Sequence, residues 1–91
     1  MFNDYELEQK ANKIEELRKE VKANKKCMEY YEYLKELNRN DIMYGWLFTN
    51  NDMLEEDLYE FSTCYQKPYV LSVMQVYINE LESIILKTRD L

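Results

Sequence analysis

The chain has 91 residues, of which 46% are apolar, 14% aromatic and 33% charged, and its net charge is −6. Such a composition is too apolar for a disordered chain, and the length suits a single helical domain over residues 1–91 with a modest core. One glycine and one proline are too few turn-forming residues for an all-β or a doubly wound α/β fold. The negative net charge disfavours direct binding of nucleic acid.

The first predicted element is one long helix over residues 3–38, because no glycine or proline interrupts this stretch. Asn3 or Asp4 can cap it, and Glu6 stands at the capping-box position relative to Asn3. Its apolar stripe begins with four large side chains at helical spacing, namely Leu7, Ile14, Leu17 and Val21. Beyond Met28 the stripe moves to a neighbouring face, and we interpret this shift as the drift of a straight helix with 3.6 residues per turn.

A short hydrophobic connection over residues 38–52 follows, and Asp52 then caps a second predicted helix over residues 53–66. The pair Lys67-Pro68 interrupts the chain, and the last helix is predicted from about Tyr69 to Lys87. The expected fold class is therefore all-α: a long N-terminal helix, a hydrophobic connection and two shorter helices packed back on the first as a helical bundle.

The helix lengths predict self-association. A helix over residues 3–38 is about 50 Å long, whereas the last helix spans about 30 Å and covers little more than half of it. Leaving Leu7, Ile14, Leu17 and Val21 uncovered forgoes several kcal/mol of burial. We therefore expect these four side chains to mediate a homodimer, or to be covered by a partner protein.

Residues 50–61, NNDMLEEDLYEF, contain five carboxylates and no positive side chain. On a helical wheel the apolar residues of this segment gather on one side, and the opposite side carries Asp52, Glu55, Glu56, Tyr59 and Glu60. Carboxylates about 6 Å apart resemble a row of phosphates, so this face could fill a basic groove on a partner with Tyr59 as its aromatic anchor. The competing interpretation is a solvated helix face, which is what most charge runs are.

Basic residues concentrate earlier in the chain, where residues 10–26 carry seven lysines and arginines against three glutamates. They surround the predicted helix rather than forming one stripe, which favours an ordinary charged helix over a nucleic-acid reader. The alternative is that this stretch docks on an acidic partner, including the acidic face of a second copy. The nine tyrosines leave two interpretations open, a small core of amphipathic rings or an interface.

Most catalytic and cofactor chemistry is excluded by composition. The chain contains no histidine, which removes the Ser-His-Asp triad, the Cys-His dyad and Cys/His zinc sites. A single glycine excludes the glycine-rich phosphate loops, and Cys27 and Cys64 are expected to be small buried hydrophobes, with a reactive Cys27 as the minor alternative. We therefore expect no enzyme activity, no cofactor and no metal site, with a carboxylate-based enzyme as a distant third hypothesis.

No apolar run approaches the roughly 20 residues that span a bilayer, and no secretory signal is recognisable, so a cytoplasmic location is expected. The leading functional hypothesis is a small acidic interaction protein that inhibits a partner by occluding its basic, nucleic-acid-binding surface. Size and charge are typical of phage anti-defence or anti-CRISPR inhibitors that act as DNA mimics. The alternative is a structural or regulatory helical module that self-associates through its first helix.

Overall fold

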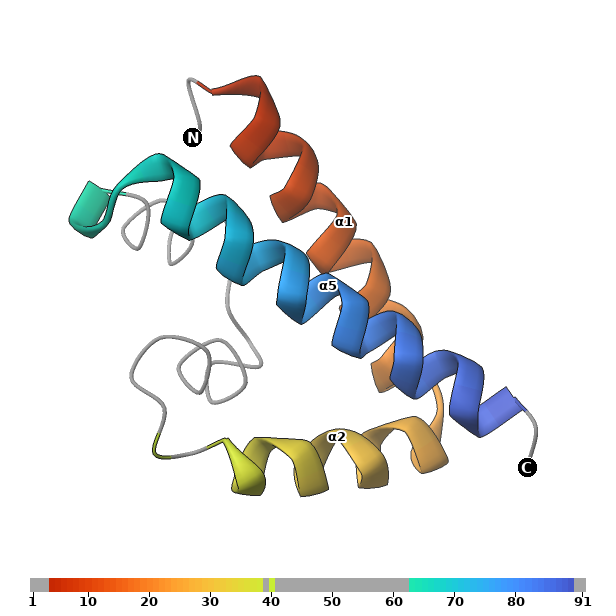
Figure 1. Ribbon diagram of the computed structural model, residues 1–91. Helices are drawn as coiled ribbons and strands as arrows, with labels where there is room; N and C mark the ends of the chain where they lie inside the picture. The colour runs from red at the N-terminus through yellow and green to blue at the C-terminus, as the bar shows by residue number, and fades with distance from the viewer. Residues whose placement is uncertain (1–3, 39, 41–62, 90–91) are drawn as a thin grey trace.

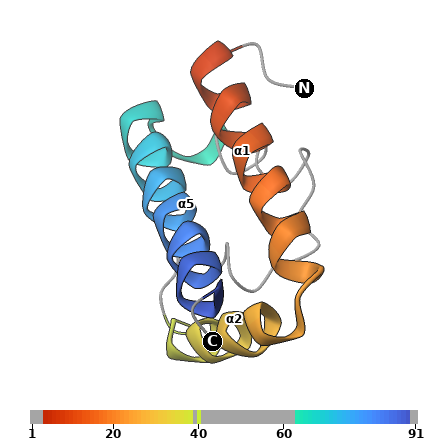
Figure 2. The ribbon, with the colours of Figure 1, turned by 90° about the vertical axis from the view of Figure 1, so that its right-hand side faces the viewer.

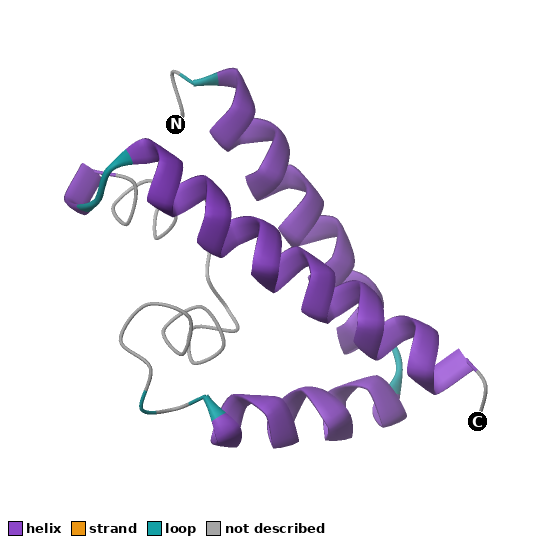
Figure 3. Ribbon diagram, in the orientation of Figure 1, coloured by secondary structure: helices purple, strands orange, loops and turns teal. Residues whose placement is uncertain are grey.

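The computed structural model describes residues 4–38, 40 and 63–89 of this chain. These residues form three long helices, α1 (Tyr5–Lys22), α2 (Lys25–Leu37) and α5 (Lys67–Arg89), and none of them is in a strand (Figures 1 and 3). Helices α2 and α5 both pack on α1, and α2 also contacts α5. The predicted all-α helical bundle is confirmed.

Helices α1 and α5 lie side by side and run in the same direction, while α2 crosses beneath their C-terminal ends (Figures 1 and 2). Ion pairs mark both ends of this parallel pair. At the start, the Lys67 ammonium lies 2.7 Å from the Asp4 carboxylate and 3.1 Å from that of Glu6. At the end, the Arg89 guanidinium lies 3.6 Å from the Glu20 carboxylate.

Asp4 begins α1 as the sequence predicts. Its carboxylate accepts hydrogen bonds from the backbone N–H groups of Glu6 (3.0 Å) and Leu7 (3.3 Å), which would otherwise be unsatisfied at a helix start. The hydrogen bond from Lys67 is the largest cause that lowers the pKa of Asp4 below its ordinary value. Asp4 therefore fixes the start of α1 and also links it to the start of α5.

The core forms between the apolar stripes of α1 and α5. Every third or fourth residue of α1 faces α5, which presents an even broader apolar stripe and contacts both α1 and α2. Several α5 side chains are completely buried, including Met74, Tyr77, Leu81 and Ile84 at 0% exposure. Burying each such side chain stabilises the fold by roughly 1.5–3 kcal/mol relative to leaving it exposed.

Helix α5 is longer than predicted at both ends. It starts at Lys67 and ends at Arg89, two residues beyond the predicted limits on each side. Pro68 lies in its first turn, where a missing N–H group costs no hydrogen bond, so this proline starts the helix instead of preceding it. The Gln66 carbonyl accepts the first hydrogen bond, from the N–H of Val70 at 3.0 Å.

The predicted continuous helix over residues 3–38 is wrong, because the chain turns between α1 and α2. Asn24 has extended backbone angles (φ −125°, ψ 121°) and caps α2, its side-chain oxygen accepting from the N–H groups of Lys26 (2.9 Å) and Cys27 (3.3 Å). The turn brings Cys27 and Tyr31, each 2% exposed, into the core. The shift of the apolar stripe after Met28 thus marks a change of direction rather than helical drift.

The predicted hydrophobic connection and most of the predicted helix over residues 53–66 lie outside the described residues. Of that helix, Thr63 and Cys64 are described and are helical, whereas Tyr65 and Gln66 are not. The described chain therefore leaves the helical conformation two residues before the predicted end.

Candidate functional site

The predicted self-association surface belongs to the core of a single chain. Exposure is 7% for Leu7, 1% for Ile14, 5% for Leu17 and 2% for Val21. The expectation that α1 leaves these side chains uncovered is wrong, because α1 is much shorter than 36 residues and α5 runs along its whole length. The homodimer stays a prediction, but uncovered α1 side chains no longer support it.

The predicted partner-binding residues Asp52, Glu55, Glu56, Tyr59 and Glu60 all lie outside the described residues. The structure neither groups nor separates these side chains. The role of this segment therefore stays a prediction that depends on its charge and on its position between α2 and α5.

The most unusual group of side chains within the described residues is a buried polar trio, formed by Arg18 of α1, Tyr31 of α2 and Tyr77 of α5. The Arg18 Nε donates a hydrogen bond to the Tyr77 hydroxyl at 2.8 Å, and the two tyrosine hydroxyls share a hydrogen bond at 2.7 Å. The Arg18 guanidinium also lies 5.1 Å from the centre of the Tyr77 ring, within cation–π range. This trio joins all three helices through polar contacts inside the core.

Burial is the largest cause that raises the pKa of both Tyr31 and Tyr77 above the ordinary tyrosine value, since a phenolate loses its hydration there. The positive charge of Arg18 opposes this effect at both hydroxyls. Both tyrosines are therefore neutral near pH 7 and serve as hydrogen-bonding groups, not as bases. The chemistry of the trio is that of a structural network.

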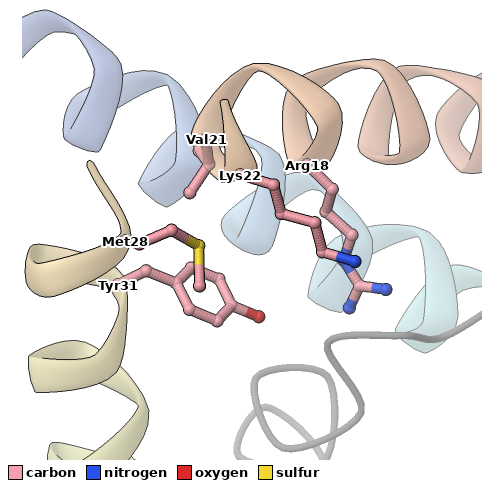
Figure 4. A pocket seen from close by; sticks show the side chains of 5 residues that line it. All are labelled: Arg18, Val21, Lys22, Met28 and Tyr31. Atoms are coloured by element: carbon pink, nitrogen blue, oxygen red, sulfur yellow. The ribbon is translucent and has the colours of Figure 1, made fainter. Parts of the chain in front are cut away.

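A small cavity lies beside the trio in the corner between α1 and α2 (Figure 4). Its volume is about 10 Å³, and Arg18, Val21, Lys22, Met28 and Tyr31 line it. That volume is about the minimum for a single water molecule and far below the size of a small-molecule site. The cavity is therefore too small to hold a substrate.

The sequence analysis missed the trio. Arg18 was counted with the basic residues of a charged helix, whereas the structure leaves it only 5% exposed. The position of Arg18 in the sequence indicates its burial, because it follows Ile14 by four residues and precedes Val21 by three. This spacing places Arg18 on the apolar face of the helix. Tyr77 lies on the apolar stripe of α5, but its hydrogen-bonding role has no signature in the sequence.

The tyrosines divide between the two interpretations that the sequence left open. Tyr31 and Tyr77 fill the core with their hydroxyls paired, while Tyr33 is 58% exposed and lies at the surface. Tyr30 takes an intermediate position, accepting a hydrogen bond from Lys87 at 2.9 Å. This contact ties the end of α5 to α2.

A wider, shallow groove runs over the outer seam of α1 and α5. Its volume is about 270 Å³, and the residues that line it are Gln9, Lys10, Lys13, Gln75, Ile78 and Glu82. Lys10 donates a hydrogen bond to Gln75, which in turn donates to Asn79 at 2.9 Å. The Lys10–Gln75 contact ties α1 to α5 at the surface, while the Gln75–Asn79 contact lies within α5.

The two cysteines have opposite environments. Cys27 is 2% exposed and its Sγ lies 2.9 Å from the Thr88 hydroxyl, as predicted for a buried hydrophobe. The same prediction is wrong for Cys64, which is exposed just before the start of α5. We expect the thiol reagent DTNB to modify one thiol per folded chain rapidly and the second only after denaturation, because reaction requires an accessible thiolate. The Cys64→Ser variant should show no rapid phase. A rapid phase that survives in this variant would contradict the burial of Cys27.

Within residues 4–38 and 63–89, no group of three or more cysteine, aspartate or glutamate side chains is arranged to hold a metal ion. None of the described helices combines the length and the hydropathy needed to cross a bilayer.

Comparison with known proteins finds no matching family model, no similar curated protein and no similar solved structure.

Proposed function

We propose that this chain is a non-catalytic interaction protein that inhibits its partner by occupying a basic surface, with the carboxylates of residues 41–62 as the contact region. The single observation that carries the proposal is the distribution of charge between this segment and the described helices. The partner is a protein whose basic surface normally binds nucleic acid.

The described residues are electrically balanced. Eleven lysine and arginine side chains face eleven aspartate and glutamate side chains within residues 4–38, 40 and 63–89. Residues 41–62 contain six carboxylates and no base, which equals the net charge of the whole chain. The charge of this protein is therefore concentrated in one segment of 22 residues, whereas a purely solubilising charge could be spread over every exposed helix face.

The helices hold the chain on both sides of this segment. Helix α2 leads into it and is fixed to the core by Cys27 and Tyr31, while α5 follows it and contains most of the fully buried side chains. The segment thus departs from and returns to one packed bundle. Fixed ends reduce the conformational freedom that a binding segment loses on association.

The composition of the segment suits recognition of a basic groove. Its carboxylates can pair with lysine and arginine side chains that otherwise contact phosphates, and Tyr59 and Trp46 belong to the residue types enriched at binding hot spots. Inhibitors of DNA- or RNA-processing enzymes, including phage anti-defence and anti-CRISPR proteins, are the functional class that this combination of size and charge supports.

A charge-reversal experiment tests the proposal. We expect the wild-type chain to reduce DNA cleavage by a susceptible member of a panel of nucleases, including RNA-guided ones, and the triple variant Glu55→Lys/Glu56→Lys/Glu60→Lys to lose this inhibition. Inhibition by the wild-type chain should also weaken steeply as salt is raised, because close charge pairs at an accessible surface are screened.

The matched control is Glu15→Lys/Glu16→Lys/Glu29→Lys, which changes the net charge by the same amount on exposed positions of α1 and α2. This variant should retain most of the inhibition. Equal losses in both triple variants would show that only total charge matters, and no inhibition of any nuclease by the wild-type chain would remove the proposed function.

A further inference from the structure

The corner between α1 and α2 depends on the backbone of one residue. Ala23 still has helical angles (φ −77°, ψ −10°), and Met28 already donates a helical hydrogen bond to the Asn24 carbonyl at 3.0 Å. Only Asn24 is extended between them, with ψ at 121°. Rotation at this residue alone would join α1 and α2 into one continuous helix.

The hydrogen bonds of the corner are supplied by the same residue. The Asn24 N–H donates to the Val21 carbonyl at 3.2 Å, and the Asn24 side chain accepts from the N–H groups of Lys26 and Cys27. In a continuous helix the carbonyls of Lys22 and Ala23 would accept those last two bonds instead. The side chain of Asn24 thus replaces the helical acceptors that the turn removes.

The local sequence otherwise favours the straight form. No glycine or proline lies between Val21 and Cys27, and alanine and lysine are good helix formers. The first turn of α2 also contains Lys25 and Lys26 and no acidic residue, an arrangement that opposes the positive end of the helix dipole. A continuous helix has no such terminus at this position.

A single chain cannot straighten alone, because α1 would leave α5 and expose the apolar stripe of both helices. A second copy presents the same two surfaces, so each α1 could pack on the α5 and α2 of the other chain with its present contacts. We propose that Asn24 is a hinge through which two copies of this chain exchange their α1 helices, and that its capping side chain keeps the wild-type chain in the closed monomer. The partner for this surface is therefore a second copy of the chain.

Removing the cap tests the proposal. We expect Asn24→Ala and Asn24→Gln to dimerise about a hundredfold more tightly than the wild-type chain, since each of the two hinges loses a cap and gains helix propensity. Asn24→Ser and Asn24→Asp retain a capping oxygen and should stay monomeric. Light scattering after size-exclusion chromatography measures the mass, and far-UV circular dichroism should show no loss of helix in any of the four variants.

Cross-linking distinguishes the exchange of α1 helices between two chains from the association of two closed chains. Lys10 of α1 and Gln75 of α5 are hydrogen-bonded on the outer surface, so Lys10→Cys/Gln75→Cys in a Cys64→Ser background provides two nearby thiols, with Cys27 buried. A short bismaleimide should join them within one chain when Asn24 is present, and between two chains in the Asn24→Ala variant.

Three results would overturn the proposal. These are a monomeric or unfolded Asn24→Ala variant, a dimer cross-linked only within each chain, or equal dimerisation of the Asn24→Ser variant. The exchange does not depend on the acidic segment, so its failure leaves the proposed inhibition standing.

Discussion

Replacing Leu17 with aspartate is expected to destabilise the fold severely. Leu17 is 5% exposed, so the variant loses its apolar burial and places a carboxylate among the apolar side chains of the core. The combined cost exceeds about 4 kcal/mol, which is a large share of the roughly 5–13 kcal/mol expected for a domain of this length. Far-UV circular dichroism at 25 °C, followed by urea titration of any residual helix, measures the effect.

The matched control is Leu86→Asp, which makes the same substitution on α5 at a leucine that is 59% exposed. Its free energy of unfolding should change by no more than about 0.5 kcal/mol. A Leu17→Asp variant that stays fully helical and loses only an ability to dimerise would instead support the surface role that the sequence suggested for Leu17, and would contradict the packing of α1 on α5.

Replacing Tyr77 with phenylalanine should lower the free energy of unfolding by about 2–4 kcal/mol, because it removes an acceptor from a buried charged donor and a partner from a buried hydroxyl. The ring stays in place, so the cation–π contact with Arg18 and the apolar packing are preserved. The loss therefore reports on the hydroxyl alone. Urea denaturation followed by circular dichroism measures it.

Two tyrosine variants calibrate this result. Tyr31→Phe removes the contact between the two hydroxyls but leaves the hydrogen bond from Arg18 to Tyr77, and should cost about 0.5–1.5 kcal/mol, whereas Tyr69→Phe, at 49% exposure, should change stability by less than about 0.5 kcal/mol. A Tyr77→Phe variant as stable as Tyr69→Phe would show that the trio contributes nothing measurable to the fold.

These two predictions concern the scaffold, and the proposed inhibition concerns a different part of the chain. In the described helices, several polar groups are engaged in structure: Arg18 and Tyr77 in the core, Asp4 at a helix cap and Cys27 beside Thr88. The net charge is carried by residues 41–62, whose sequence contains none of these groups. Variants of the trio should therefore change stability without changing the charge that the proposed partner would recognise.

Local chemistry made several features predictable. Asp4 caps α1 because a short acceptor before an apolar-periodic stretch satisfies free N–H groups, wherever the rest of the chain lies. The stripes of α1 and α5 follow from the spacing of their leucine, isoleucine, valine and methionine residues. The charge segregation that supports the proposed function is likewise a property of composition along the chain.

The sequence analysis failed where two helices had to be considered together. Asn24 has the chemistry of a helix cap, yet it was treated as an ordinary position within a long helix, and the uncovered length of that helix then suggested a dimer. Asparagine is tolerated inside helices, so the turn depends on the burial of Cys27 and Tyr31 against α5 together with the cap that Asn24 supplies.

By itself, therefore, the sequence determined the all-α class, the start of α1, the core-facing residues of α1 and α5, and the concentration of negative charge in residues 41–62, because each depends on neighbours within a few positions. Only the tertiary structure decided that the chain turns at Asn24, that α5 covers Leu17 and that Arg18 lies inside beside Tyr77. These outcomes depend on contacts between residues as far as 59 and 61 positions apart, whose free energies no local pattern contains.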